Sequence, residues 1–498
     1  MAMINCPECG KRISSEAISC PSCGYPLSLK TQKSVKEQGS AFSQTDAMNQ
    51  VPSNESVVIK AKDITKENSP KRMNFSVLDN SYFKEGISSY IGISAGSEKT
   101  TSAIMQNGKV SLLPYEYPSL EYLDFSSKLK ILQGIKYRFE NEYYIKLKGA
   151  VITVPNYYSI RDRLDIIRVA KLAGFEQAKT SGNLSASLLS LAFKVPLPED
   201  HVCLLINFDN SYTEATLCIV GDGVFEVLDE YYITSISNIK IRNELSNYIN
   251  NYYLVLHNID LSTKEKASDR IKKEANRIFD ELNSSLEHHV FLPNIFTDRT
   301  GSKDIDFYIR QEDIETIMAK TIIELESFIK SIMLKADSIS RVIALGTIAR
   351  QPMVKGVLKR KLNVEPVFRN DESAIGSALY GGIYSGTISG VLVLEIIPRN
   401  IKLQSADTVT EYFVKGSMFS TSKSIFSTSE ENQRSVGASI VEELNGITQK
   451  IGEISLDNLP PLPKGSQIEV ELHIGPWLTI AAKIRVIATG LSKTIVIE

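Results

Sequence analysis

Residues 149–155 read Gly149-Ala-Val-Ile-Thr-Val-Pro155 and are followed by a helical pattern from Ile160 to Leu172. The first stretch is a short apolar run rich in β-branched residues, which predicts a buried strand. The same order recurs further along the chain, where Arg341-Val-Ile-Ala-Leu-Gly346 precedes a helix predicted over residues 351–362. Strands beside helices in this order predict an α/β body.

Other strands extend this body on both sides of the first stretch. Ser88-Ser-Tyr-Ile-Gly-Ile-Ser-Ala-Gly96 predicts a strand that enters a glycine turn. Residues 202–208, 215–220 and 224–228 predict consecutive strands of a second sheet, whereas residues 239–286 carry a charged, helical period.

The C-terminal part changes character. After a glycine-rich segment over residues 378–390 and the apolar run Val391-Leu-Val-Leu394, the sequence turns to short β-like runs separated by turns. These runs cover residues 438–441, 467–472, 478–484 and 494–497. Short, regularly spaced strands with turn signals predict a β-sandwich.

The N-terminus carries two CxxCG knuckles, formed by Cys6 with Cys9 and by Cys20 with Cys23. Two intervening residues let both thiolates of a knuckle bind one ion, so four thiolates predict a structural tetrahedral zinc site in a small ribbon. The alternatives are two disulfides, which lack a secretory signal, or redox motifs, which lack a βαβ context. Cys203 and Cys218 lie in apolar strand patterns and are predicted to be core residues.

Length and composition limit the remaining possibilities. The chain has 498 residues, 43% of them hydrophobic, with 56 basic and 58 acidic side chains. This length suggests about three domains. The near-zero net charge argues against bulk nucleic-acid or membrane-surface binding, and the sequence shows neither an apolar run of spanning length nor a signal peptide. We therefore expect a soluble cytoplasmic protein.

Several motifs occur together in one order along the chain. They are Ala150-Val-Ile-Thr-Val-Pro-Asn-Tyr-Tyr158, Ala170-Lys-Leu-Ala-Gly-Phe175, Gly223-Val-Phe-Glu-Val227, Asn370-Asp-Glu-Ser-Ala-Ile-Gly376, Phe426-Ser-Thr-Ser-Glu-Glu-Asn-Gln433 and Asn458-Leu-Pro-Pro-Leu-Pro-Lys-Gly465. From about Tyr90 to the C-terminus, this set resembles the heat-shock protein 70 (DnaK-like) chaperone family. The N-terminal zinc ribbon is not part of that family's usual plan.

The resemblance implies an actin-like, two-lobed α/β ATPase fold joined by an apolar linker to a β-sandwich domain that binds peptide. We expect a zinc ribbon over residues 1–28, a disordered linker rich in polar residues over 29–84, and the ATPase-like domain over 85–388 with a shortened sub-lobe. An apolar interdomain linker over 389–395 and a sandwich over 396–498 follow. Since the chain stops at Glu498, the family's helical lid is expected to be absent.

The first phosphate loop of the family matches Ser94-Ala-Gly96-Ser97-Glu98. Gly96 and the Ser97 hydroxyl are kept, but Ser94 replaces the Asp that helps hold magnesium. Glu98 puts an acid where phosphates should bind, which costs on the order of 4 kcal/mol at 4 Å and an effective dielectric near 20. Lys99 is the candidate to offset part of this charge.

The second phosphate loop matches Asn207-Phe-Asp209-Asn210-Ser211-Tyr212, where Asn207 replaces an Asp and no glycine of the family's triplet remains. The glutamate near the attacking water falls at Asn183. The adenosine loop keeps Gly346 and Arg350 but has Thr347 for its second glycine, and the adenine-side helix keeps only Arg277.

These losses predict a pseudo-ATPase that acts as a polypeptide-binding or scaffold protein, with the zinc ribbon as a docking module. Zinc is the cofactor predicted, whereas ATP with magnesium is left open. The alternatives are an active ATP-dependent chaperone with rearranged acids, for instance Asp209 and Glu214 on magnesium, and weak nucleotide binding without hydrolysis. A carbohydrate kinase on the same fold gives no reason for the sandwich. A polypeptide client is the expected partner, and Val436 matches the family's central peptide-pocket valine, although an apolar residue on a strand is by default a core residue.

Overall fold

The computed structural model describes residues 3–5, 12–14, 75–76 and 87–497, except for 195–196, 199, 282, 300, 337, 370–371, 406–407, 445 and 476–477. The chain forms two compact units, Met1–Asn74 and Phe75–Glu498. In the first unit, β1 (Met3–Asn5) pairs antiparallel with β2 (Arg12–Ser14). Cys6, Cys9, Cys20 and Cys23 lie outside the described residues.

The first sheet of the second unit has the order β6-β5-β4-β8-β9, with β7 paired to β5. Its strands are β4 (Ile87–Ala95), β5 (Lys99–Gln106), β6 (Lys109–Leu112), β7 (Tyr117–Pro118), β8 (Gly149–Val154) and β9 (Gln177–Gly182). The adjacent strands β4, β8 and β9 run parallel. Every residue of β8 is buried, as its uninterrupted apolar run predicted.

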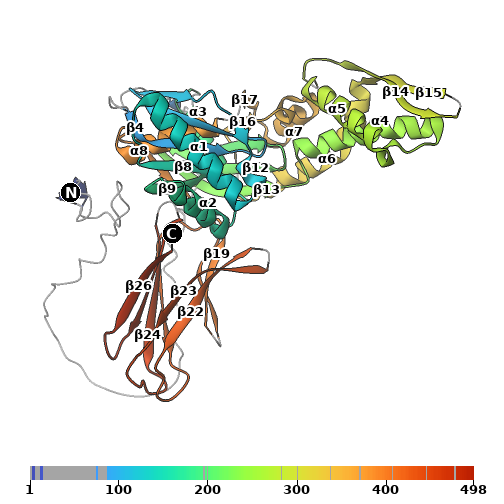
Figure 1. Ribbon diagram of the computed structural model, residues 1–498. Coiled ribbons are helices and arrows are strands. Elements are labelled where there is room, and N and C mark those ends of the chain that lie inside the picture. The colour runs from blue at the N-terminus through green and yellow to red at the C-terminus, as the bar shows by residue number, and fades with distance from the viewer. Residues whose placement is uncertain are drawn as a thin grey trace. The chain divides into compact units, whose positions relative to one another are not determined.

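The helices of this lobe are α1 (Phe125–Tyr143), α2 (Ile160–Leu172) and α3 (Asn183–Leu191). The short helix η2 (Leu120–Tyr122) precedes α1, and α3 directly follows β9. Figure 1 shows α1 and α2 beside the strands of the first sheet. The helix predicted over Ile160–Leu172 is confirmed with both of its bounds. Ser159 and Asp162 form a capping box at its start, which satisfies main-chain donors that the first turn leaves free.

The second sheet has the order β17-β16-β11-β12-β13-β18. Its strands are β11 (Val202–Phe208), β12 (Thr213–Gly221), β13 (Val224–Ile233), β16 (Arg341–Leu345), β17 (Val367–Arg369) and β18 (Leu392–Leu394), with α7 (Pro352–Leu362) and α8 (Ser373–Ser385) between them along the chain. The last strand, β18, is the apolar run predicted as interdomain linker, and it joins the sheet by parallel pairing with Val224–Glu226. The mixed sheets and helices confirm the α/β body.

Two glycines let α8 pack closely against α3 and against strand β4. A Cβ at Gly376 of α8 would be 1.8 Å from the carbonyl oxygen of Ala186 in α3, and one at Gly92 of β4 would be 2.1 Å from the nitrogen of Ala378. Only a residue without a side chain permits such approaches. Gly376 belongs to a motif that the sequence singled out, and its role is packing.

A sub-lobe extends the second sheet with α4 (Asn238–His257), η3 (Leu261–Thr263), α5 (Glu265–Glu281), the hairpin β14 (Glu287–Asp298) and β15 (Gly301–Arg310), and α6 (Gln311–Met333) (Figure 1). The helical period over residues 239–286 is thus divided between two helices. Asn258 ends α4 in the left-handed conformation, with φ of 56°, and Asp260 caps η3. Asn is one of the few residues that stops a helix in this way.

Two four-stranded antiparallel sheets make up the C-terminal part, with the orders β20-β19-β22-β23 and β21-β24-β25-β26. Their strands are β19 (Asn400–Gln404), β20 (Val409–Phe413), β21 (Thr421–Ser427), β22 (Val436–Leu444), β23 (Ile447–Leu456), β24 (Gln467–Ile474), β25 (Ile480–Val486) and β26 (Ser492–Ile497). The inner faces of both sheets share one apolar core, which is the arrangement of a β-sandwich.

One pairing falls inside the stretch predicted as a disordered linker. β3 (Phe75–Ser76) pairs antiparallel with β10 (Leu197–Pro198). The main chain of β10 thus provides a partner that the polar composition does not reveal, and the linker over 29–84 stays a prediction. Across the described part of the chain, no helix is both long and apolar enough to cross a membrane.

Candidate functional site: the loops after β4 and β11

The first predicted phosphate loop follows β4. Ser94 and Ser97 are both buried, at 3% and 2% exposure. The Ser94 hydroxyl lies 2.7 Å from that of Ser373, the first residue of α8. The position that would help hold magnesium in the family is thus hydrogen-bonded to a neutral hydroxyl of the protein itself.

The second predicted loop follows β11 and touches the first loop directly. The Ser97 hydroxyl donates to the Asp209 carboxylate at 2.6 Å and accepts from the main-chain N–H of Asn210 at 3.1 Å. Asp209 also accepts from the N–H of Asn210 at 2.7 Å. The donors expected to face a phosphate therefore bind the opposite loop.

A fully buried tyrosine follows in the second loop. Tyr212 has no exposed surface, its hydroxyl accepts from the side-chain amide of Asn183 at 3.1 Å, and its ring lies edge-on to that of Tyr157, 5.0 Å away. At this position of the predicted second phosphate loop, an aromatic ring packs between the two lobes. Asn183, at the position of the family's glutamate, serves as a donor to this ring's hydroxyl.

Glu121 adds an acid to this aromatic cluster. Its carboxylate accepts hydrogen bonds from the hydroxyls of Tyr157 and Ser211. Burial raises the pKa of the Glu121 carboxyl, and the bond from Tyr157 offsets part of that rise. No signal in the sequence marks Glu121 or Tyr157 as a site residue, because both reach the site from elements outside the loop motifs.

Glu98 is paired by a residue from the other lobe. Its carboxylate lies 3.8 Å from the guanidinium of Arg242 in α4, which also donates to the Asn210 side chain at 3.2 Å. The guanidinium stacks on Phe279, 4.5 Å from the ring centre. Lys99, the predicted partner, instead forms an ion pair with Glu116. Arg242 lies in a helix of charged periodicity, where no local signal marks it.

The acids of the alternative magnesium site are also engaged. Glu214 is fully buried and accepts from the main-chain N–H of Asn156 at 3.1 Å. It lies opposite Asn207 in the antiparallel pair of β11 and β12. Among the described residues, no group of three or more His, Cys, Asp or Glu is arranged to hold a metal ion.

The adenosine side is held by hydrogen bonds between the loop and the end of α5. The Asn283 side chain donates to the carbonyl of Thr347 at 2.9 Å and accepts from Gln351 at 2.9 Å. Gly346 has φ of +94°, and a Cβ there would lie 2.2 Å from the Phe208 carbonyl oxygen, so this glycine is needed for the fold itself. Arg350, the last residue of η4 (Ile348–Arg350), is exposed.

Arg277 forms ion pairs with acids of its own helix. Its guanidinium donates to Glu274 at 2.6 Å and to Glu281 at 2.8 Å, and these acids hold its pKa above the ordinary value. Both arginines that match the family on the adenosine side, Arg350 and Arg277, are thus present. The charge of Arg277 is already paired with neighbouring carboxylates of its own helix.

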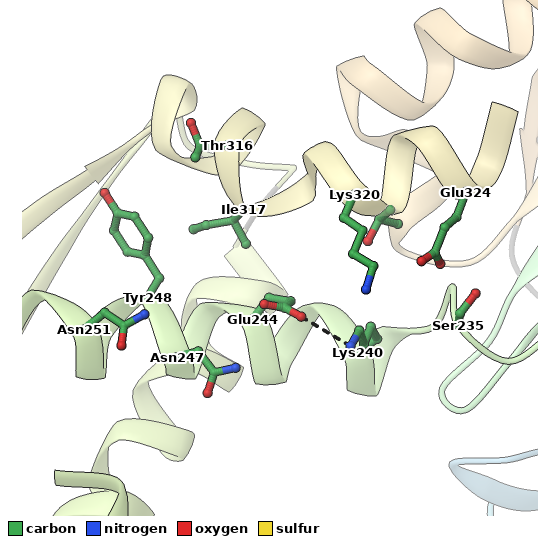
Figure 2. Close-up of a pocket in the computed structure, with 11 residues that line it drawn as sticks. Ser235, Lys240, Glu244, Asn247, Tyr248, Asn251, Thr316, Ile317, Lys320 and Glu324 are labelled. Carbon is green, nitrogen blue, oxygen red and sulfur yellow. Dashed lines mark ion pairs between the residues drawn. The ribbon is translucent and has the colours of Figure 1, made fainter. Parts of the chain in front are cut away.

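A groove of about 280 Å³ lies elsewhere, between α4 and α6. Figure 2 shows Lys240 and Glu244 of α4 facing Lys320 and Glu324 of α6 across it. The predicted nucleotide residues are absent from its lining, which consists of Ser235, Lys240, Glu244, Asn247, Tyr248, Asn251, Thr316, Ile317, Lys320, Thr321 and Glu324. Its charges of both signs give no preference for a polyphosphate.

In the sandwich, Val436 is 9% exposed and belongs to the shared core. It lies opposite Leu456 in the pair of β22 and β23. The structure therefore places the predicted pocket valine among core residues, and its peptide-binding role stays a prediction.

Comparison with known families gives two matches. A family model described as Hsp70 protein matches residues 124–498. A second one, described as a zinc-ribbon domain, matches residues 2–27, the segment that contains all four knuckle cysteines.

Proposed function

The chain belongs to the Hsp70 family and carries an N-terminal zinc ribbon; from this premise we propose that it binds polypeptides without an ATP cycle. Family membership makes it a relative of molecular chaperones, for which polypeptide clients are the expected partners. In the proposal, the lobes serve as a fixed scaffold, and the sandwich and zinc ribbon each contact a protein.

The main observation in favour of lost ATP turnover is the direct contact between the two predicted phosphate loops. Ser97, Asp209 and Asn210 satisfy one another through bonds of 2.6, 3.1 and 2.7 Å. A nucleotide would have to break this set and desolvate Asp209 beside its own phosphates. Phosphoryl transfer depends on donors and metal placed around the phosphates beforehand, so we infer that hydrolysis is lost.

Charge supports the same inference. Glu98 brings a carboxylate to the first loop and is paired internally by Arg242. The carboxylate of Glu98 thus pairs with Arg242, the cation that reaches this loop from the other lobe and that a phosphate would otherwise contact. ATP with magnesium does not fit the residues present, and no step of the proposed function involves it.

For the N-terminus we propose structural zinc on Cys6, Cys9, Cys20 and Cys23, within a ribbon over residues 1–28. Four thiolates are a complete donor set for tetrahedral zinc, and the zinc-ribbon match covers all of them. The remaining proposed divisions are a linker over 29–84, an ATPase-like domain over 85–388, a linker over 389–395, and a β-sandwich over 396–498.

The test is whether ATP with magnesium is a ligand. A ligand at one hundred times its dissociation constant stabilises a protein by about 2.7 kcal/mol, so binding at millimolar ATP raises the melting temperature measurably. We expect no shift and no phosphate release above the blank. An ATP-hydrolysing member of the family serves as the positive control.

Other outcomes assign the alternatives. A thermal shift without phosphate release means nucleotide binding without hydrolysis. Phosphate release that is lost in both Asp209→Asn and Glu214→Gln means that the rearranged acids work and that the chain is an active chaperone.

A further inference from the structure

Two carboxylates meet where the linker strand joins the second sheet. Glu395 directly follows β18, and Glu230 lies in β13, the strand with which β18 pairs. Both line a cavity of about 10 Å³, close to the lower limit for one water molecule. The other lining residues are Arg163, Gly182, Ile396, Pro398 and Leu478, so α2, the linker and the sandwich all contribute.

Glu395 is held by hydroxyl groups of the lobes. Its carboxylate accepts from Ser181 at 2.8 Å and from Tyr380 at 3.3 Å. These bonds tie the end of the linker to β9 and α8. Releasing the linker from the sheet would return this carboxylate to water.

Glu230 is the more enclosed of the two acids, at 8% exposure. A Cβ at Gly182 would lie 3.3 Å from one of its carboxylate oxygens, so the glycine leaves the room that this side chain uses. Arg163, at 3% exposure, is the buried cation of the site.

The charges around the pair do not fully compensate two carboxylates. Arg163 of α2 acts on both acids, whereas Lys415, after β20, places its ammonium on the Glu230 main-chain carbonyl at 3.2 Å. Asp229, next along β13, adds a further negative charge. The groups that face the pair are thus the cations Arg163 and Lys415, the acid Asp229, and the phenols of Tyr380 and Tyr384.

Burial therefore favours a proton at this pair. It raises the pKa of Glu230 to about 7, although Arg163 lowers it, and Glu395 raises it further. Burial also raises the pKa of Glu395. With one proton bound, Arg163 faces a single carboxylate charge.

We propose that a proton bound at Glu230 and Glu395 holds the linker strand on the second sheet, so that pH controls linker docking in this chain. Docking brings the two acids together in a site of low exposure. Undocking returns Glu395 to solvent and also uncovers Glu230, which Ile396, Pro398 and Leu478 help to enclose. The proton favours the docked form, because two ionised carboxylates are costly only where both are buried together.

The direction of the pH dependence of docking follows from the raised pKa of Glu230. Below the ordinary glutamate pKa of 4.5, both forms are protonated and docking is fully stabilised. As pH rises towards about 7, only the docked form keeps the proton, and each pH unit weakens docking by up to about tenfold. Docking is weakest above that range, where both forms have lost it.

The experiment is hydrogen exchange of the full-length protein at pH 5.5 and 7.5, corrected for the intrinsic pH dependence of amide exchange. We expect the protection of the amides of Leu392–Leu394 to fall by about tenfold or more between the two values, because the docked form keeps its proton to higher pH than the undocked form. Amides of β11 report global unfolding and should keep their protection at both values.

Glu230→Gln mimics the protonated acid and should leave the linker amides protected at both pH values. Glu226→Gln, on the same strand and opposite Leu394 but outside the cavity, is the matched control and should keep the wild-type change. Linker protection in the wild type that does not change with pH overturns the proposal, as does a wild-type change that persists in Glu230→Gln. If Glu230→Gln does not fold, Glu395→Gln is subject to the same two outcomes.

Discussion

The Glu442 carboxylate of the sandwich accepts a 2.8 Å hydrogen bond from the main-chain N–H of Ile160, the first residue of α2. The next N–H, of Arg161, donates to the other oxygen at 3.1 Å. A carboxylate at a helix N-terminus satisfies donors that the first turn leaves free and meets the positive end of the helix dipole. Glu442 thus joins the sandwich to the first lobe as a cap supplied from another domain.

Replacing this acid should loosen the sandwich from α2. Glu442→Ala removes both hydrogen bonds, and we expect a loss of about 1 kcal/mol, the usual cost of a lost helix cap. Hydrogen exchange of Ile160 and Arg161 should report it as an approximately fivefold loss of protection. Glu453→Ala, at an exposed position of β23, is the control, and equal protection in both variants would contradict the role of Glu442.

Two glycines allow a matched test of the adenosine loop. Gly346→Ala should destabilise the protein by about 2 kcal/mol or more, because the new Cβ meets the Phe208 carbonyl at 2.2 Å in a backbone conformation with φ of +94°. Gly356→Ala in α7, with no atom within 4 Å of its Cβ position, should stabilise by about 0.5–1 kcal/mol. Urea unfolding measures both; a neutral Gly346→Ala would show that the loop adjusts.

Metal removal should affect the two compact units differently. Cys6→Ser combined with Cys20→Ser leaves one thiolate in each knuckle, and zinc content should fall from about one equivalent to near zero. The melting temperature of the unit Phe75–Glu498 should not change, because its core contains none of these residues. Cys203→Ala should retain zinc, and zinc retained by the double variant would move the site elsewhere.

Val436 distinguishes a peptide pocket from a packed core. Val436→Phe overfills a buried position and should cost about 1–3 kcal/mol in stability. If the position also lines a groove, anisotropy of a labelled apolar peptide should show micromolar or weaker binding that the substitution abolishes and ATP does not change. Lower stability with unchanged peptide affinity would leave Val436 as a core residue alone.

Local patterns predicted much of the fold. The start of α2 follows from Ser159 and Asp162, which cap the helix within its own sequence. The buried strands β8 and β11 follow from short, mostly apolar runs. The division of residues 239–286 at Asn258 was missed, because one residue in a left-handed turn outweighs a continuing helical period.

The site was only partly accessible to such reasoning, because its interactions join distant segments. Ser97 and Asp209 are 112 residues apart, and Ile160 and Glu442 are 282 apart. The sequence identified the altered loop residues one by one. That Arg242 would pair with Glu98, or that Tyr212 would pack on Tyr157, depends on the tertiary structure alone.

The parallel pairing of β18 with β13 also bears on aggregation. β18 is the outermost strand of its sheet, and without it the N–H and C=O groups of Val224–Glu226 would form an open strand edge. Open edges recruit strands from other chains. A chain cut before Leu392, or one whose linker is released, would therefore exchange the three-residue edge strand β18 for the ten-residue β13, which is a longer template for self-association.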